Sequence, residues 1–208
     1  EVILEAPRPL VGLLASLGAG VTVVPEGETL PPSDFHCPLM SLPLAFGTRV
    51  GTVPVQEPYL FPDPRKVEAW RESLGARTKP RVGLFWRGSD ADPHRAPRSL
   101  PLEALEPILE LPLEFHSLQR ELPEDGAERL RSHPALRTHP ELSMDFPGTA
   151  ALIANLDLVL SIDSSIAHLA GAMGKPAWLL LPHAPDWRWM LRRKDSPWYP
   201  SMTIYRQE

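Results

Sequence analysis

The stretch 158–170 restricts the possible folds of this chain more than any other. An apolar run of strand length, Leu158 to Ile162, ends at Asp163, and two serines then lead into an Ala-rich pattern of helical period. Such a strand–turn–helix unit is typical of parallel α/β sheets. The first N–H groups of the helix have no partner inside it, and the helix dipole favours negative charge there. The stretch therefore predicts an α/β fold with an anion site at this turn.

The polar residues of this turn are the first candidates for that site. Ser164 or Ser165 can cap the helix, and His168 follows three or four residues later on the same helical face. Two interpretations are open: a phosphate-bearing ligand binds here, or these side chains only cap and tether the helix. Asp163 repels a phosphate, so we expect it to orient the turn or to accept hydrogen bonds from backbone or ribose.

Strand-like and helix-like segments alternate along most of the chain, which predicts parallel sheets. Apolar runs predict strands at 2–5, 21–24, 81–86, 113–118, 136–139, 158–162, 177–181 and 203–205, with a further candidate at 35–39. Helical spacing predicts helices at 9–17, 41–46, 65–74, 102–109, 125–132, 148–155 and 166–173.

The strands are unevenly divided along the chain. About three precede residue 54, fewer than a self-sufficient doubly wound sheet needs. We therefore expect residues 1–53 to form a partial N-terminal Rossmann-like domain, 54–79 a proline-rich linker with one helix, and 80–208 a C-terminal Rossmann-like domain. The chain opens on Glu1 inside a strand-like segment, which suggests that a preceding segment has been removed.

Composition argues against several classes of protein. The 21 Lys and Arg against 26 Asp and Glu leave a net charge of −5, and without a basic block no nucleic-acid partner is expected. Asn155 and Asp157 interrupt the longest apolar run, so no membrane span is expected. The single cysteine, Cys37, fits a reducing cytoplasm, and no Cys/His set has zinc spacing, so we expect a cytoplasmic protein without a metal.

Polar residues follow five of the predicted strands of the C-terminal part. Right-handed crossovers bring the carboxyl ends of parallel strands to one edge, where ligands of such sheets bind. The loop 90–100 either closes on a pyrophosphate or is merely solvated, and the tryptophans of 182–189 either stack on a sugar or base or pack against a neighbouring domain. The residues expected at a donor or phosphate site are Arg87, Gly88, Ser89, Arg95, Arg98, Gln119, Thr149, Asp163, Ser164, Ser165 and His168.

Two longer patterns resemble a known family. Residues 163–170, followed by Gly174-Lys175-Pro176, resemble the Asp-[Ser/Thr]-x-x-x-His-Leu-Ala…Gly-Lys-Pro signature of GT-B glycosyltransferases of the heptosyltransferase type, family 9. The segments 36–43, 98–102, 117–119 and 185–189 are similar to the glycosyltransferase-like module at the C-terminus of bacterial tetratricopeptide-repeat proteins.

The resemblance implies a GT-B-like fold, two Rossmann-like domains with a cleft between them. It implies that the C-terminal domain binds a nucleotide-diphosphate sugar as substrate through Asp163, Ser164, Ser165 and His168, and that the intact protein transfers the sugar to a protein or glycan acceptor without cofactor or metal. The N-terminal loop that would supply the catalytic base is missing here, so no catalytic residue is assigned and this chain alone is not expected to be a complete enzyme. The alternatives are a GT-B-type nucleotide-sugar epimerase and a non-catalytic nucleotide-sugar-binding or scaffold module.

Overall fold

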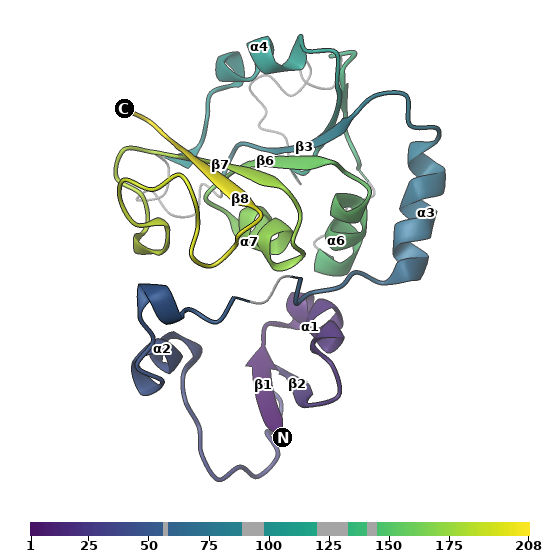
Figure 1. Cartoon of the computed structure of the whole chain (residues 1–208). Coiled ribbons are helices and arrows are strands. Elements are labelled where there is room, and N and C mark those ends of the chain that lie inside the picture. Colours follow the sequence, from purple (N-terminus) through teal and green to yellow (C-terminus); the bar gives the residue numbers. More distant parts are fainter. Residues whose placement is uncertain (56–57, 89–97, 120–132, 141–144) are drawn as a thin grey trace.

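Two parallel β-sheets organise the chain in the computed structural model, which describes residues 1–55, 58–88, 98–119, 133–140 and 145–208 (Figure 1). The larger sheet comprises β3 (Arg81–Phe85), β4 (Glu114–Ser117), β5 (Leu136–Arg137), β6 (Leu158–Ile162), β7 (Ala177–Leu181) and β8 (Met202–Arg206). The smaller sheet pairs β1 (Val2–Ala6) with β2 (Val21–Pro25). The predicted α/β fold with parallel sheets is confirmed.

The strand order of the larger sheet is β5-β4-β3-β6-β7-β8, and all of its neighbouring strands run parallel. Numbered along the chain within this sheet, the order is 3-2-1-4-5-6, the Rossmann order. The direction of winding reverses between β3 and β6. In open sheets of this kind, ligands bind in the crevice beyond the carboxyl ends of the strands at this reversal.

Helices cover both faces of the larger sheet (Figure 1). On one face, α6 (Phe146–Ala154) and α7 (Ser165–Ala172) pack in a core that also includes Val159 and Leu179. On the other, the 3₁₀ turn Leu102–Ala104 and α4 (Glu106–Leu109) cover a second core around Trp86 and Leu160. Because both faces of the sheet are covered, β6 and β7 consist mainly of apolar residues.

The central strand β3 depends on a glycine. A Cβ atom at position 83 would lie 2.6 Å from Cδ1 of Leu156 and 2.8 Å from Cδ1 of Leu118. The absence of a side chain therefore lets both leucines, which lie beside the neighbouring strands β6 and β4, pack directly on the backbone of β3.

The N-terminal part packs below α6 and α7 (Figure 1). A β-α-β unit is built from β1, α1 (Arg8–Leu14) with the 3₁₀ turn Ala15–Leu17, and β2, and is followed by the turns Leu39–Ser41 and Val50–Thr52 around α2 (Leu42–Ala45). The peptide N–H groups of Tyr59 and Leu60 donate to the carbonyl of Ala172 at the end of α7 (2.9 and 3.1 Å).

The strand proposed at 35–39 is wrong. The described residues there form no strand: Phe35 is 93% exposed, and Ser41 donates its N–H to the carbonyl of Pro38 (2.8 Å) in a 3₁₀ turn. Pro38 has no N–H for a strand ladder, so the local backbone turns. The helix predicted at 125–132 lies outside the described residues.

The helix α3 (Pro64–Leu74) lies where its spacing predicted. The Asp63 side chain caps it by accepting the N–H of Arg65 (2.8 Å), and Gly75, at φ 70°, ends it. This helix packs on α6, and Asn155 Nδ2 donates to the carbonyl of Val67 (3.0 Å).

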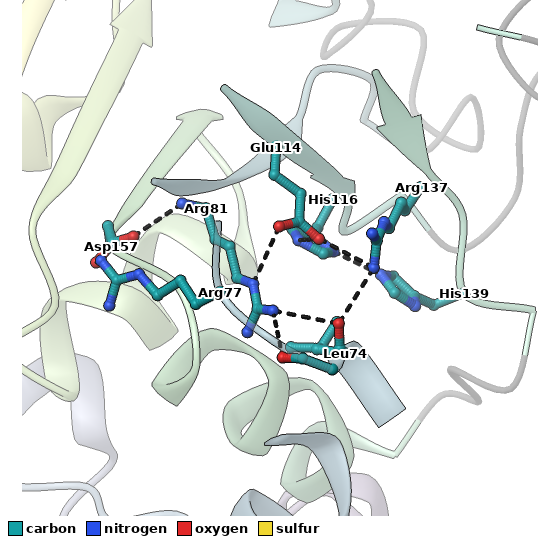
Figure 2. A network of polar contacts seen from close by, with 9 residues as sticks. Leu74, Arg77, Arg81, Glu114, His116, Arg137, His139 and Asp157 are labelled. Atoms are coloured by element: carbon teal, nitrogen blue, oxygen red, sulfur yellow. Dashed lines mark hydrogen bonds and ion pairs between the residues drawn. The ribbon is translucent and has the colours of Figure 1, made fainter. Parts of the chain in front are cut away.

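A buried ion-pair network fastens α3 to the amino edge of the sheet (Figure 2). The Arg81 guanidinium pairs with Glu114 (3.3 Å) and donates to the carbonyls of Leu74 (3.2 Å) and Gly75 (2.8 Å) at the end of the helix. Arg137 pairs with the same carboxylate (3.0 Å) and also donates to the Leu74 carbonyl (3.3 Å). Cations at a helix C-terminus are favourable, so one carboxylate and two arginines fix α3 against β3, β4 and β5.

A histidine pair continues this network toward the helix. His116 in β4 is fully buried, and its Nδ1 lies 3.0 Å from Nε2 of His139, whose ring packs edge-on against Trp70 of α3 (5.0 Å between centroids). Burial, and then the positive charges of His139, Arg137 and Arg81, lower the pKa of His116 to about 3. His116 therefore stays neutral in the folded protein at neutral pH.

This lowered pKa predicts a pH-dependent stability. Between about pH 3 and pH 6.5 the unfolded chain protonates His116 and the folded chain does not, so the free energy of unfolding should fall by about 1.4 kcal/mol for each pH unit below about 6 from this group. Urea denaturation between pH 4.5 and 7.5 measures the slope. His116→Gln removes this titrating group, so the slope should fall by about 1.4 kcal/mol per pH unit. An unchanged slope in the variant would contradict the assignment.

Candidate functional site

The turn after β6 holds the cap of α7. Ser164 has the extended backbone of an N-cap (φ −157°, ψ 169°), and its Oγ accepts the N–H of Ala167 (3.3 Å). The same oxygen lies 2.9 Å from Oγ of buried Ser161, which donates to the carbonyl of Ile162 (2.8 Å). Of the two serines considered from the sequence, Ser164 is therefore the cap, and its hydroxyl is already used.

The first two N–H groups of α7 are those of Ser165 and Ile166. In the part of the chain that the structure describes, neither has a hydrogen-bond partner, and the Ser165 side chain is exposed. Two backbone donors and the exposed Ser165 hydroxyl thus lie after the carboxyl end of β6, where the winding of the sheet reverses. Such a helix start attracts anions.

His168 lies one turn into α7, on the side of its cap. Its Nδ1 is 3.0 Å from the hydroxyl of Tyr199, and its ring stacks on Trp189 (5.1 Å between centroids, 22° between planes). Burial lowers the pKa of His168 and the charge of Arg188 acts in the same sense, against the opposing carboxylates of Asp163 and Asp186. The imidazole is therefore a neutral, oriented group at the start of the helix.

Asp163 forms an ion pair at the same turn. Its carboxylate, only 8% exposed, lies 2.9 Å from Nη1 of Arg98, and Nη2 of that arginine lies 4.0 Å from Asp186. The structure thus brings Arg98 to the Asp163 turn. The charge of Arg98 is, however, shared between two carboxylates.

Asp186 organises the next loop on this edge. It caps the 3₁₀ turn Trp187–Trp189 and accepts hydrogen bonds from the Arg188 N–H (3.1 Å) and side chain (2.9 Å). Although burial acts to raise it, these hydrogen bonds and the charges of Arg188 and Arg98 lower the pKa of Asp186. Arg188 also covers the ring of Trp187 (4.7 Å to the centroid).

The ends of β3 and β4 are joined by one side-chain amide. Gln119 accepts the N–H of Arg87 at Oε1 (3.1 Å) and donates from Nε2 to the Arg87 carbonyl (2.9 Å). The next N–H, of Gly88, donates to Oγ of Ser99 (3.1 Å). Because β3 lies between β4 and β6, these residues lie at the same carboxyl edge of the sheet as the Asp163 turn, and Gln119 fixes the backbone that follows β3.

The remaining predicted site residues lie apart or outside the described structure. Thr149 donates its hydroxyl to the carbonyl of Asp145 (3.3 Å) in the first turn of its own helix α6. Among the described residues, no hydrogen bond or ion pair joins it to the Asp163 turn. Ser89 and Arg95 fall outside the described residues.

Part of the family-like signature supports the fold. Gly174, at φ 63°, ends α7, and Lys175 donates from Nζ to the carbonyls of Ala154 (3.0 Å) and Leu156 at the end of α6. Burial lowers the pKa of Lys175, with Asp157 opposing. The Gly-Lys-Pro segment thus serves the ends of the helices α7 and α6, and it is not part of the carboxyl edge where a ligand is expected.

Sequence reasoning missed three partners in this site: Ser99, Asp186 and Tyr199. Each bonds to a residue at least eleven positions away, which local spacing does not reveal. Gly171, one turn after His168, is a local signal for the Tyr199 contact, because a helical glycine often marks a close packing contact.

A sheet of Rossmann order with an open helix start at its reversal point defines an α/β protein suited to a phosphate-bearing ligand. Comparison with known proteins then makes the class more specific. Residues 126–189 match the profile of glycosyltransferase family 9 (heptosyltransferase), and this stretch includes β6, α7, β7 and the loop to Trp189. The resemblance to glycosyltransferases of the heptosyltransferase type is confirmed over this stretch, whereas the tetratricopeptide-repeat context stays a prediction.

Similar proteins are longer than this chain. Protein FlbA of Caulobacter vibrioides is 32% identical over 163 residues, which are 74% of this chain and 27% of that protein. The glycosyl transferase family 9 structure from Veillonella parvula has a TM-score of 0.49 at 14% identity, covering 71% of this chain and 42% of that one. The E. coli heptosyltransferase WaaC with ADP has a TM-score of 0.44 at 17% identity, covering 62% and 38%. The chain thus spans about a quarter of FlbA and less than half of either enzyme structure.

Two further kinds of feature are absent from the described residues. None of their helices has both the length and the apolar character that a membrane crossing needs. Nor do their His, Cys, Asp and Glu side chains gather in a group of three or more that could hold a metal ion.

The cap of α7 is directly testable. Ser164→Ala removes the acceptor of the Ala167 N–H and should lower the free energy of unfolding by about 1 kcal/mol. Ser165→Ala is the matched control, because its exposed side chain is not the cap, and its effect should stay within about 0.5 kcal/mol. Urea denaturation of the three proteins decides, and equal losses in both variants would exclude Ser164 as the cap.

Proposed function

We propose that the start of α7 binds the diphosphate of a nucleotide-sugar donor, and that the protein containing this chain is a glycosyltransferase. One observation carries the proposal: two N–H groups without partners among the described residues lie beside His168, at the reversal of a Rossmann-order sheet. The family 9 match over 126–189 includes this turn. We further propose that the protein is cytoplasmic and that the intact protein, of which this chain is a part, contains repeats.

The proposed contacts divide between backbone and side chains. The N–H groups of Ser165 and Ile166, the Ser165 hydroxyl and His168 Nε2 contact phosphate oxygens. Asp163 keeps its ion pair with Arg98 and holds that guanidinium at the rim of the site, where its remaining N–H groups face the second phosphate. The amide of Gln119 fixes the backbone of β3, against which the nucleoside lies.

The proposed reaction is displacement at the anomeric carbon. An acceptor hydroxyl forms the new C–O bond, the bond from that carbon to the diphosphate oxygen breaks, and the hydroxyl proton passes to a base. The diphosphate leaves with the bonding electron pair, so negative charge grows on it in the transition state. Preorganised N–H donors at the helix start stabilise that charge without reorganising.

The helix N–H group can be tested separately from the serine side chain. Proline is tolerated at the first helical position and removes only an N–H that the helix does not use, and Ser164 already has the extended backbone that precedes proline. Ser165→Pro should therefore fold and weaken diphosphate binding by about tenfold, since hydrogen bonds to charged groups contribute about 1.5–3 kcal/mol.

Calorimetry with ADP, UDP, GDP, CDP and their sugar derivatives measures this effect. Ser165→Ala, which lacks only the hydroxyl, is the matched control and should lose less affinity than Ser165→Pro. The proposal fails if none of these nucleotides binds the wild-type chain, or if the Pro and Ala variants bind equally well.

A further inference from the structure

We propose that Tyr199 is a positioning residue that fixes the tautomer of His168, so that Nε2 carries the proton and faces the anion site. This inference rests on the proposed function for its ligand, but its structural half is independent of any ligand. Tyr199 lies in the loop between the turn Trp187–Trp189 and β8, 31 residues beyond His168.

Three contacts hold the imidazole of His168 in one orientation. Its Nδ1 lies 3.0 Å from the Tyr199 hydroxyl. One face stacks on Trp189, which is fully buried, and the Tyr199 ring approaches at 62° with centroids 5.7 Å apart. Among the described residues, Nδ1 is the only ring nitrogen of His168 with a hydrogen-bond partner. Any contact to a ligand therefore falls to Nε2.

The helix is shaped to accept the tyrosine. A Cβ atom at position 171 would lie 2.4 Å from Cγ and 2.5 Å from Cδ1 of Tyr199, so only glycine leaves room for this ring on α7. Gly171 follows His168 by three residues and shares its helical face. The loop is held in turn by the buried hydroxyl of Ser196, which accepts the N–H groups of Trp198 (3.2 Å) and Tyr199 (3.3 Å).

The chemistry of the two groups selects the tautomer. Burial keeps the imidazole neutral, so only one of its nitrogens carries a proton. A phenol O–H is a good donor and the unprotonated nitrogen of imidazole a good acceptor, so the tyrosine donates to Nδ1 and the proton resides on Nε2. An Nε2–H group attracts a phosphate oxygen, whereas a lone pair there repels it. The hydrogen bond that a neighbour makes to one ring nitrogen thus decides what the other can do.

Nitrogen-15 NMR of the labelled full chain tests the structural half. Long-range ¹⁵N–¹H spectra at pH 7 should show His168 with a protonated Nε2 and an unprotonated Nδ1, assigned through His168→Gln. Tyr199→Phe keeps the ring and removes only the hydroxyl, so it should convert this signature into a mixture of tautomers. Tyr205→Phe is the control, because that half-exposed ring lies on β8 against Trp178 and should leave the signals unchanged. A protonated Nδ1 in the wild type, or an unchanged signature in Tyr199→Phe, overturns the proposal.

Binding of ADP, or of whichever nucleotide the calorimetric panel identifies, tests the link to the ligand. Tyr199→Phe should weaken binding about three- to tenfold. In the His168→Gln background the same change should have almost no effect, because the tyrosine acts through the imidazole, whereas a merely structural role would give additive losses. Additive losses therefore overturn the proposal.

Failure of the proposed function has a different outcome. If no nucleotide binds while the Nε2–H signature is present and depends on Tyr199, the positioning of His168 stands and the donor site falls. Gly171→Ala provides a second perturbation of the same contact. It should displace the Tyr199 ring and shift the His168 signals as Tyr199→Phe does, and unchanged signals would again count against the proposal.

Discussion

The position of β3 at the centre of the larger sheet is the constraint on which the other features depend. Because β3 pairs with β4 on one side and β6 on the other, the chain must cross the sheet between β5 and β6 and reverse its winding. The two edges of the sheet then differ. At the amino edge, the buried Arg81–Glu114 pair fastens α3. At the carboxyl edge, the start of α7 keeps two N–H groups unused by the described residues.

The charges at the carboxyl edge suit a site whose attraction for anions comes from the backbone. Arg98 lies between Asp163 and Asp186, so its charge is largely balanced, and His168 is kept neutral by burial. Helix N–H groups need no counterion and are fixed before a ligand arrives. The proposed site therefore draws its attraction for anions from helix N–H groups at one point, in a chain whose net charge is −5.

The sequence predicted the parts of the fold that local pattern determines. Mainly apolar runs placed β6 and β7 correctly, because strands in a sheet that is covered on both faces carry few polar residues. The strand at 35–39 failed, because a short run of mixed residues around Pro38 folds into a turn. Within the candidate site, the sequence identified Asp163, Ser164 and His168 as one group, but not which contacts their atoms make. The Tyr199–His168 contact spans 31 residues, and the Arg81–Glu114 pair spans 33, so both depend on tertiary packing that periodicity does not encode.

The structure shows which atoms of the turn each of the two interpretations involves. Much of the signature-like sequence stabilises the fold itself, because Ser164 caps α7, Gly174 ends it, and Lys175 satisfies the last carbonyls of α6. The N–H groups of Ser165 and Ile166 and the Nε2 of His168 are different, because no described residue bonds to them although the neighbouring cap is complete. The cap and the unused donors are thus separate features of the turn: the first accounts for the fold, and the second is the basis of the proposed anion site.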